Sequence, residues 1–178
     1  MEGIVSRLDP QYDDQVNGLV AELAQVFNLA PQHLPPFPHF SYQIAPRYFR
    51  PGLPEALAQL ARRHAPLLVQ TSGLGLFPGD DPVLYLPLVR TAALTALHAD
   101  LWAALAPFAI DPPQLYAPDQ WVPHLTLVAG GLRAAALGEA VQRLLPRGLY
   151  WRMPITSLSF IADTGPAQVV EHTFPLGA

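Results

Sequence analysis

Two short segments of the sequence share one pattern, in which a proline, a histidine, an apolar residue and a hydroxyl residue follow one another. Residues 38–41 read Pro-His-Phe-Ser, and residues 123–126 read Pro-His-Leu-Thr. Each segment follows a proline-rich loop and opens a run that is typical of a strand. Side chains two positions apart on a strand point to the same face, so each histidine should project together with its hydroxyl.

Four polar side chains in these segments suit chemistry on a phosphodiester if the two strands face each other. They are His39, Ser41, His124 and Thr126. One neutral imidazole can take a proton from the attacking oxygen, and one imidazolium can give a proton to the leaving oxygen. An unperturbed pKa of about 6.5 fits histidine for either role. We therefore predict the two histidines as catalytic residues and the two hydroxyls as phosphate-binding residues, and which histidine is the acid stays open.

Composition excludes several classes of function. The chain has 178 residues, which is enough for one globular unit or two small lobes that share a core. Its formal net charge of −4 argues against broad binding of DNA or RNA, although its 10 basic residues are all arginine, which suits local phosphate contacts. The absence of cysteine excludes disulfides, thiolate metal sites and a cysteine nucleophile. A small anionic ligand or a single RNA end remains compatible with this charge.

The sequence also predicts where the protein resides. Residues 1–7 have neither the basic start nor the apolar core of a signal peptide. His98 and Asp100 interrupt the longest Ala- and Leu-rich stretch, so no run reaches the length of a transmembrane helix. We therefore expect a cytoplasmic monomer that does not associate with membranes.

The remaining histidines do not predict a metal site. His98 lies on the apolar stripe of a predicted helix, where a histidine is more often a hydrogen-bonded core residue than a ligand. His33, His64 and His172 have no carboxylate partner at a metal-binding spacing. We therefore expect no metal ion and no other cofactor.

Hydrophobic periodicity predicts an α+β chain in which strands and helices alternate. Residues 78–82 predict the turn of a hairpin, and Pro87 in its second strand suggests an edge position. Thr91 is expected to cap the third helix, and one Pro-His strand in each half of the chain indicates internal pseudo-symmetry. The predicted strands cover residues 4–8, 39–44, 67–77, 83–89, 124–128, 151–161 and 169–174, the last two joined by a turn at 163–166, and the predicted helices are marked by residues 13–27, 53–61, 94–108 and 137–144.

Three aromatic residues near the two segments have two interpretations. Tyr42, Tyr116 and Trp121 could line the mouth of a cleft or stack on a base, and they could equally pack at a strand edge. Arg47 and Arg50 follow the first segment, where a solvated loop is a simpler interpretation than an anion site.

The chain resembles the 2H phosphoesterase superfamily, and within it the 2′-5′ RNA ligase family. Residues 121–127, which read Trp-Val-Pro-His-Leu-Thr-Leu, are similar to the second motif of that family with its aromatic-x-Pro lead-in. Residues 74–77 and 83–86 are similar to its central hairpin, and the order of elements matches over nearly the whole chain. The resemblance implies a single bilobal α+β domain over residues 1–178, with two antiparallel sheets lining a central cleft, helices packed outside and a pseudo-two-fold relation between the lobes.

The resemblance also implies metal-independent chemistry on a 2′,3′-cyclic phosphate or a 2′-5′ phosphodiester of a nucleotide or RNA end. By this analogy His124 activates water or a hydroxyl, and His39 protonates the leaving oxygen. The chain departs from the family at Ser41, where threonine is commoner. It also departs in residues 128–131, where RNA-acting members often carry an arginine and this chain has none before Arg133. The alternative function is a non-catalytic module on the same fold that binds a nucleotide or a phosphorylated metabolite.

Overall fold

The computed structural model describes residues 1–165 and 168–178, and it places strands and helices in alternation along most of the chain. The helices are α1 (Pro10–Phe27), α2 (Leu53–Arg63), α3 (Ala92–Leu105) and α4 (Ala134–Leu144), with 3-10 turns at Pro31–His33, Gln114–Tyr116 and Leu145–Arg147. The strands are β1 (Glu2–Arg7), β2 (His39–Ala45), β3 (Arg47–Tyr48), β4 (Leu67–Gln70), β5 (Gly75–Phe77), β6 (Val83–Pro87), β7 (Ala109–Ile110), β8 (His124–Ala129), β9 (Arg152–Ile155), β10 (Ser157–Asp163) and β11 (Gln168–Pro175).

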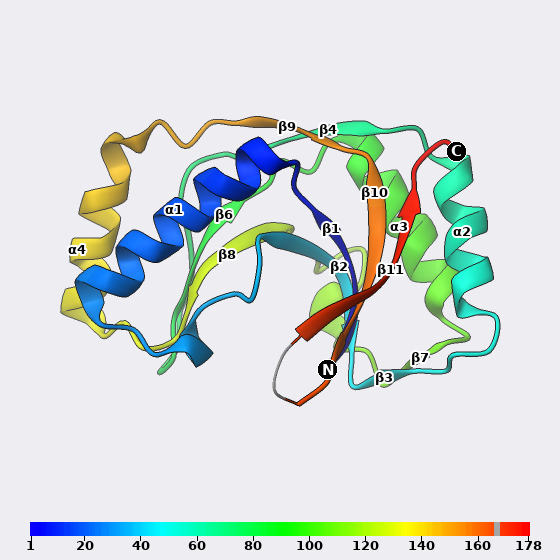
Figure 1. Ribbon diagram of the computed structural model, residues 1–178, viewed down its shortest axis with the longest axis horizontal. Helices are drawn as coiled ribbons and strands as arrows, with labels where there is room; N and C mark the ends of the chain where they lie inside the picture. The colour runs from blue at the N-terminus through cyan, green and yellow to red at the C-terminus, as the bar shows by residue number, and fades with distance from the viewer. Residues whose placement is uncertain (166–167) are drawn as a thin grey trace.

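Two antiparallel sheets organise the molecule. One has the strand order β11-β10-β1-β2 and the other has the order β5-β6-β8, while β3 pairs with β7 and β4 pairs with β9. Figure 1 shows α2 and α3 beside the four-stranded sheet, and α1 and α4 at the other end of the molecule with β6 and β8. Contacts of α3 with β2 and of α1 with β8 tie the helices to these sheets. This arrangement confirms the predicted α+β fold with helices outside antiparallel sheets.

Local sequence signals set where helix α1, which joins β1 to β2 and contacts β8, begins and ends. It begins at Pro10 rather than at the predicted Asp13, because the Asp9 carboxylate accepts a hydrogen bond from the backbone N–H of Tyr12 (3.2 Å). Proline fits the first turn of a helix, where its missing N–H is not needed. The helix ends at Asn28 in the left-handed region. Its buried face is formed by Val16, Leu19, Val20 and Leu23.

Two of the predicted strands are wrong in extent. Residues 67–77 were expected to form one strand, but the chain turns at Gly73, where φ is +109°, and separates β4 from β5. Residues 151–161 divide at Thr156 in the same way, because β9 leaves to pair with β4 while β10 joins the large sheet. Apolar content alone does not distinguish one long strand from two short strands that belong to different sheets.

The two predicted hairpins form, with one correction. Phe77 pairs with Val83 across the turn between β5 and β6. The suggestion that Pro87 marks an edge strand is wrong, because β6 pairs with both β5 and β8. Pro87 is the last residue of β6, where a missing N–H interrupts little of the ladder. In the turn between β10 and β11, Pro166 lies outside the described residues.

The buried apolar side chains form one core cluster that draws on both sheets and on all of the helices named above. Thr91 caps α3 as predicted, since its hydroxyl accepts a hydrogen bond from the backbone N–H of Leu94 (3.2 Å). Across residues 1–165 and 168–178, none of the helices combines the length and the apolar character needed to cross a bilayer.

Candidate active site

The two Pro-His segments open two edge strands that contact each other. His39 is the first residue of β2, at one edge of the four-stranded sheet, and His124 is the first residue of β8, at one edge of the three-stranded sheet. Figure 1 shows β2 and β8 near the middle of the molecule, and contacts between the two strands place them side by side. Segments far apart in sequence therefore meet where the two sheets face each other.

Burial alternates along both strands as the sequence predicts. Phe40 and Leu125 are completely buried, whereas His39 and His124 are only partly buried. The hydroxyl side chains two positions further on are also partly buried. Because successive residues of a strand point to opposite faces, the histidine and the hydroxyl of each segment lie on the face away from the core.

Each motif histidine is held by a backbone carbonyl two residues upstream. The Nδ1 atom of His39 donates to the carbonyl oxygen of Phe37 (2.9 Å), and the Nδ1 atom of His124 donates to that of Val122 (2.7 Å). A carbonyl oxygen can only accept, so the proton of the neutral imidazole is on Nδ1 in both rings. The Nε2 atom of each ring is thus left with a lone pair for proton transfer.

The environment lowers the pKa of both histidines. Burial lowers the pKa of His39, and the charges of His124 and Arg7 lower it further, while the hydrogen bond to Phe37 opposes this. Burial also lowers the pKa of His124, against the opposing effect of its hydrogen bond to Val122. An anion held between the two histidines would favour the imidazolium form.

Aromatic rings fix the position of His124. Its ring lies 5.0 Å from that of Phe77, edge to face, and 4.9 Å from that of Tyr85. Phe77 and Tyr85 stack on each other at 4.2 Å. Gly75 makes room for this stack, because a Cβ atom at that position would clash with the Tyr85 ring.

The two hydroxyl groups predicted to hold phosphate have no hydrogen-bond partner in the described part of the chain. Within residues 1–165 and 168–178, neither the Ser41 hydroxyl nor the Thr126 hydroxyl makes a hydrogen bond. Each can therefore donate to a ligand oxygen without giving up an existing bond. The backbone of Ser41 is anchored instead, since its carbonyl oxygen accepts a hydrogen bond from the indole N–H of Trp121 (2.9 Å).

A buried cluster connects the two motifs behind the site. The ring of His98 stacks on that of Trp121 at 3.8 Å and 5°, and its Nε2 atom donates to the carbonyl oxygen of Tyr42 (3.1 Å). Burial lowers the pKa of His98 to about 4, so the ring is neutral. His98 is a hydrogen-bonded core residue, as predicted. Together with the indole bond to Ser41, this cluster fixes β2 against the segment that leads into β8.

The same cluster distinguishes between the two interpretations of Tyr42 and of Trp121. Tyr42 does not line a cavity or stack on a base, because it is completely buried and shares a hydrogen bond with Ser6 (3.0 Å). Tyr42 lies two residues after the buried Phe40, so the alternation of β2 places both side chains on the same, buried face. Trp121 contributes to a cavity wall, but only 1% of it is exposed and its ring already stacks on His98, so it is not available to a base.

Tyr116, for which the sequence left two interpretations open, lines a cavity. It is partly buried and lines a cavity of about 240 Å³ beside His124. The cavity is largely apolar, and its one side-chain amide belongs to Gln120. The full lining consists of Phe77, Leu115, Tyr116, Gln120, Trp121, Val122 and His124. An apolar space with one amide suits a flat ring such as a nucleobase.

The sequence did not identify Arg7 as a site residue. Arg7 is directly opposite His39 in the pairing of β1 with β2, and its guanidinium lies over the ring of Phe37 at 5.3 Å. Its contact with Asp13 is loose, at 3.6 Å, and the side chain is 45% exposed. The sequence shows only a charged residue at the end of an apolar strand. Its place opposite His39 becomes evident only when β1 and β2 are known to pair.

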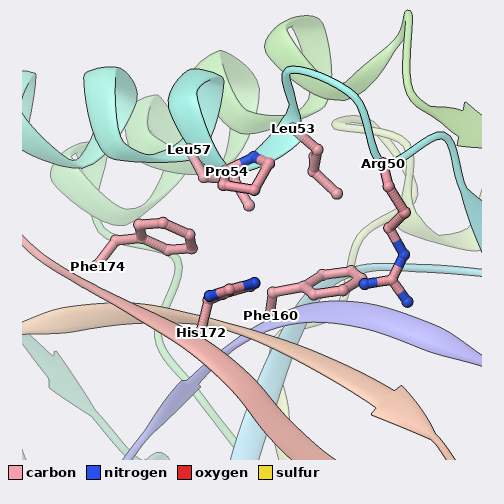
Figure 2. Close-up of a pocket in the computed structure, with 7 residues that line it drawn as sticks. All are labelled: Arg50, Leu53, Pro54, Leu57, Phe160, His172 and Phe174. Carbon is pink, nitrogen blue, oxygen red and sulfur yellow. The ribbon is translucent and has the colours of Figure 1, made fainter.

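A second cavity lies on the other face of the four-stranded sheet, away from the motif histidines. It has a volume of about 150 Å³ and is lined by Arg50, Leu53, Pro54, Leu57, Phe160, His172 and Phe174. Figure 2 shows His172 and Phe160 of the sheet facing α2 across this space. Arg50 forms ion pairs with Glu2 and Glu171, so its charge is already compensated. Among residues 1–165 and 168–178, no group of three or more His, Cys, Asp or Glu side chains is arranged to hold a metal ion.

Comparisons with known proteins agree with this architecture. The family model described as 2′-5′ RNA ligase superfamily matches residues 9–166. The crystal structure of TT0787 of Thermus thermophilus is similar with a TM-score of 0.64 at 20% identity, over 100% of this chain and 99% of that chain. The structure of Usb1 from Kluyveromyces marxianus is similar with a TM-score of 0.52 at 17% identity, over 98% of this chain and 97% of that one. No curated protein matches the sequence.

Proposed function

Because the chain belongs to the 2′-5′ RNA ligase superfamily, we propose that it is a metal-independent phosphodiesterase of nucleotide or RNA ends. Its substrate is a 2′,3′-cyclic phosphate or a 2′-5′ phosphodiester. The observation that carries the proposal is that the edge strands β2 and β8, which begin with His39 and His124, contact each other. Each of these histidines has Nδ1 bound to a carbonyl, and its Nε2 makes no hydrogen bond to the residues described. Two imidazoles in this arrangement supply an acid and a base to one phosphate.

The proposed hydrolysis balances with one neutral and one protonated imidazole. Nε2 of His124 takes a proton from water while the water oxygen forms a bond to phosphorus. The bond from phosphorus to the ribose oxygen breaks, and Nε2 of His39 gives its proton to that oxygen. Ser41 and Thr126 donate hydrogen bonds to the non-bridging oxygens, where charge increases in the transition state. The same steps in reverse form a phosphodiester bond. The assignment of His124 as the base and His39 as the acid follows the resemblance to the family.

Arg7 supports the same site electrostatically. Its position opposite His39 brings a positive charge near the phosphate, and no arginine lies in residues 128–131 to supply one from the other side. A guanidinium suits a phosphate oxygen because its donors are planar and always charged. We propose that Arg7 contributes to phosphate binding.

The first test replaces each motif histidine. His39→Ala and His124→Ala should each lower kcat on 2′,3′-cyclic AMP and on a 2′-5′-linked diadenosine by about 10²–10⁴-fold, the usual contribution of a general acid or base. His172→Ala is the matched control, because that exposed histidine lines the other cavity and should leave kcat unchanged. Near wild-type rates for either motif variant would overturn the acid and base scheme.

A non-catalytic binding module remains the second candidate. The lowered pKa of both histidines favours it, because fewer imidazolium groups are present near pH 7 to act as the acid. The absence of an arginine in residues 128–131 and the net charge of −4 point the same way. Tight binding of 2′,3′-cyclic AMP with no product at any pH from 5 to 9 would favour this function over the enzyme.

A further inference from the structure

A polar hollow of about 390 Å³ lies next to Arg7, across β1 from His39. Arg7, Leu8, Pro10, Asp13, Asp14, Ser157, Ser159 and Thr173 line it. Three of these side chains are hydroxyls from β10 and β11, and two are carboxylates from the first turns of α1. The composition differs from that of the apolar cavity beside His124.

Strand pairing connects this hollow to the candidate active site. Val5 pairs with Ser41 on one side and with Ser159 on the other, and Ser159 pairs in turn with Thr173. Residues directly opposite each other in antiparallel strands project from the same face of a sheet. The Ser41 hydroxyl, proposed to bind phosphate, and the hydroxyls of the hollow therefore lie on one face. Arg7 belongs to both regions, because it lines the hollow and lies directly opposite His39 in the pairing of β1 with β2.

The polar groups of the hollow keep capacity for a ligand. The hydroxyls of Ser159 and Thr173 are 3.2 Å apart and share one hydrogen bond, which leaves the second proton free. No group in the described part of the chain forms a hydrogen bond with the Ser157 hydroxyl. The Oδ1 atom of Asp13 is buried, lies 3.6 Å from Nη2 of Arg7 and accepts no hydrogen bond from the residues described. Donors and acceptors thus both face the space.

The charged side chains around the hollow indicate which chemical group it can bind. One guanidinium faces two carboxylates, those of Asp13 and Asp14, so a second phosphate would meet net repulsion. The hydroxyl groups of a sugar suit the site better, because they donate to carboxylates and accept from serine, threonine and arginine. A nucleobase is already matched by the apolar cavity on the His124 side.

We propose that this hollow is a sugar subsite, which binds the ribose of a second nucleoside beyond the phosphate. The preferred ligand then carries a nucleoside on each side of the phosphate, with a base beside His124 and a ribose beside Arg7. The inference rests on the proposed function, because the phosphate between the histidines sets the position of the ribose. A cyclic mononucleotide would fill only half of this arrangement.

Equilibrium binding to the full-length His124→Ala variant, which prevents turnover during the measurement, tests the subsite. A 2′-5′-linked diadenosine should bind at least 10-fold more tightly than adenosine 2′-monophosphate. Adding Ser157→Ala and Thr173→Val should remove this advantage and leave the affinity for the monophosphate unchanged, which also shows that the variant is folded. Thr156→Val is the control, since this exposed neighbour does not line the hollow.

Two results would overturn the subsite. One is equal affinity for the two ligands before the hollow is altered. The other is an advantage of the dinucleotide that persists after both hydroxyls are removed. Turnover by the wild-type protein is measured separately, so a protein that binds the dinucleotide through Ser157 and Thr173 without cleaving it would retain the subsite and lose the proposed catalytic function.

Discussion

At the scale of residues, short-range hydrogen bonds orient the two motif histidines. Phe37 and Val122 supply the carbonyl oxygens that hold Nδ1, and each lies two residues before its histidine. The same local geometry thus arises twice from the same local sequence pattern. The long-range contribution comes from burial and from Arg7, which together lower the pKa of His39.

The pH dependence follows from these shifts. A lowered pKa means that each imidazole is protonated only at a pH below 6.5, and the scheme needs one protonated and one neutral ring. We expect a bell-shaped profile of kcat/KM with its maximum below pH 6.5, because kcat/KM reports the free enzyme. The two limbs of the pH profile of kcat should lie at higher pH than those of kcat/KM, because the bound phosphate favours the imidazolium form. A maximum of kcat/KM above pH 8 would contradict this account.

Replacing Arg7 should change both binding and this profile. Arg7→Gln removes a positive charge that lowers the pKa of His39, so the limb set by His39 should move to higher pH. The loss of a charge-assisted hydrogen bond, about 1.5–3 kcal/mol, should raise KM by roughly 10- to 100-fold. Arg7→Lys keeps the charge and should keep the position of the limb. The account of Arg7 fails if the profile of Arg7→Gln is superimposable on that of the wild type.

At the scale of elements, the site depends on two edge strands from different sheets. Trp121 is the link between them, because its N–H binds the carbonyl of Ser41 and its ring packs on His98. His98 in turn binds the carbonyl of Tyr42. These groups position the two strands relative to each other.

Trp121→Phe tests this positioning role. It keeps an aromatic ring and removes the indole N–H, which leaves the carbonyl of Ser41 without that donor. We expect a loss of about 1–2 kcal/mol in the free energy of unfolding, measured with urea, and a fall in kcat larger than the change in KM. The tyrosine control Tyr150→Phe, at an exposed position, should change neither. An unchanged kcat in a destabilised Trp121→Phe protein would show that the link serves stability only.

Elements with strong local signals could be predicted from the sequence. The cap at Thr91, the buried stripe of α1 and the alternation in β2 and β8 all depend on neighbouring residues, and the structure contains them. The pairing of β4 with β9 and the central place of β6 depend on contacts distant in sequence. For Tyr42 and Trp121 the sequence left a cleft and a packed strand edge equally open, because nothing local shows that Ser6 and His98 contact them.

At the scale of the whole molecule, the candidate site lies where the edges of the two sheets meet, and neither sheet forms it alone. The hydroxyl-lined hollow on one side and the apolar cavity on the other give the site two unlike halves. The role of Arg7 could not be predicted for the same reason, since its significance arises from the pairing of β1 with β2. The net charge of −4 adds no general attraction for polyanions.

This charge predicts a weak dependence on salt. With one or two phosphate contacts, the slope of log(kcat/KM) against log salt concentration should be about −1, and lengthening an RNA beyond two nucleotides should add little. The measurement is kcat/KM for di- and decanucleotide substrates between 50 and 300 mM NaCl. A slope of about −4 or steeper for the longer substrate would reveal an extended RNA surface that this account lacks.

The claim on which the rest depends is that His39 and His124 share one anion. Nuclear magnetic resonance of the histidine rings during titration with adenosine 2′-monophosphate tests it directly. We expect the signals of His39 and His124 to shift together with one dissociation constant, and the pKa of each to rise, while the signal of His172 stays in place. A shift of only one motif histidine, or two shifts with different dissociation constants, would contradict the claim.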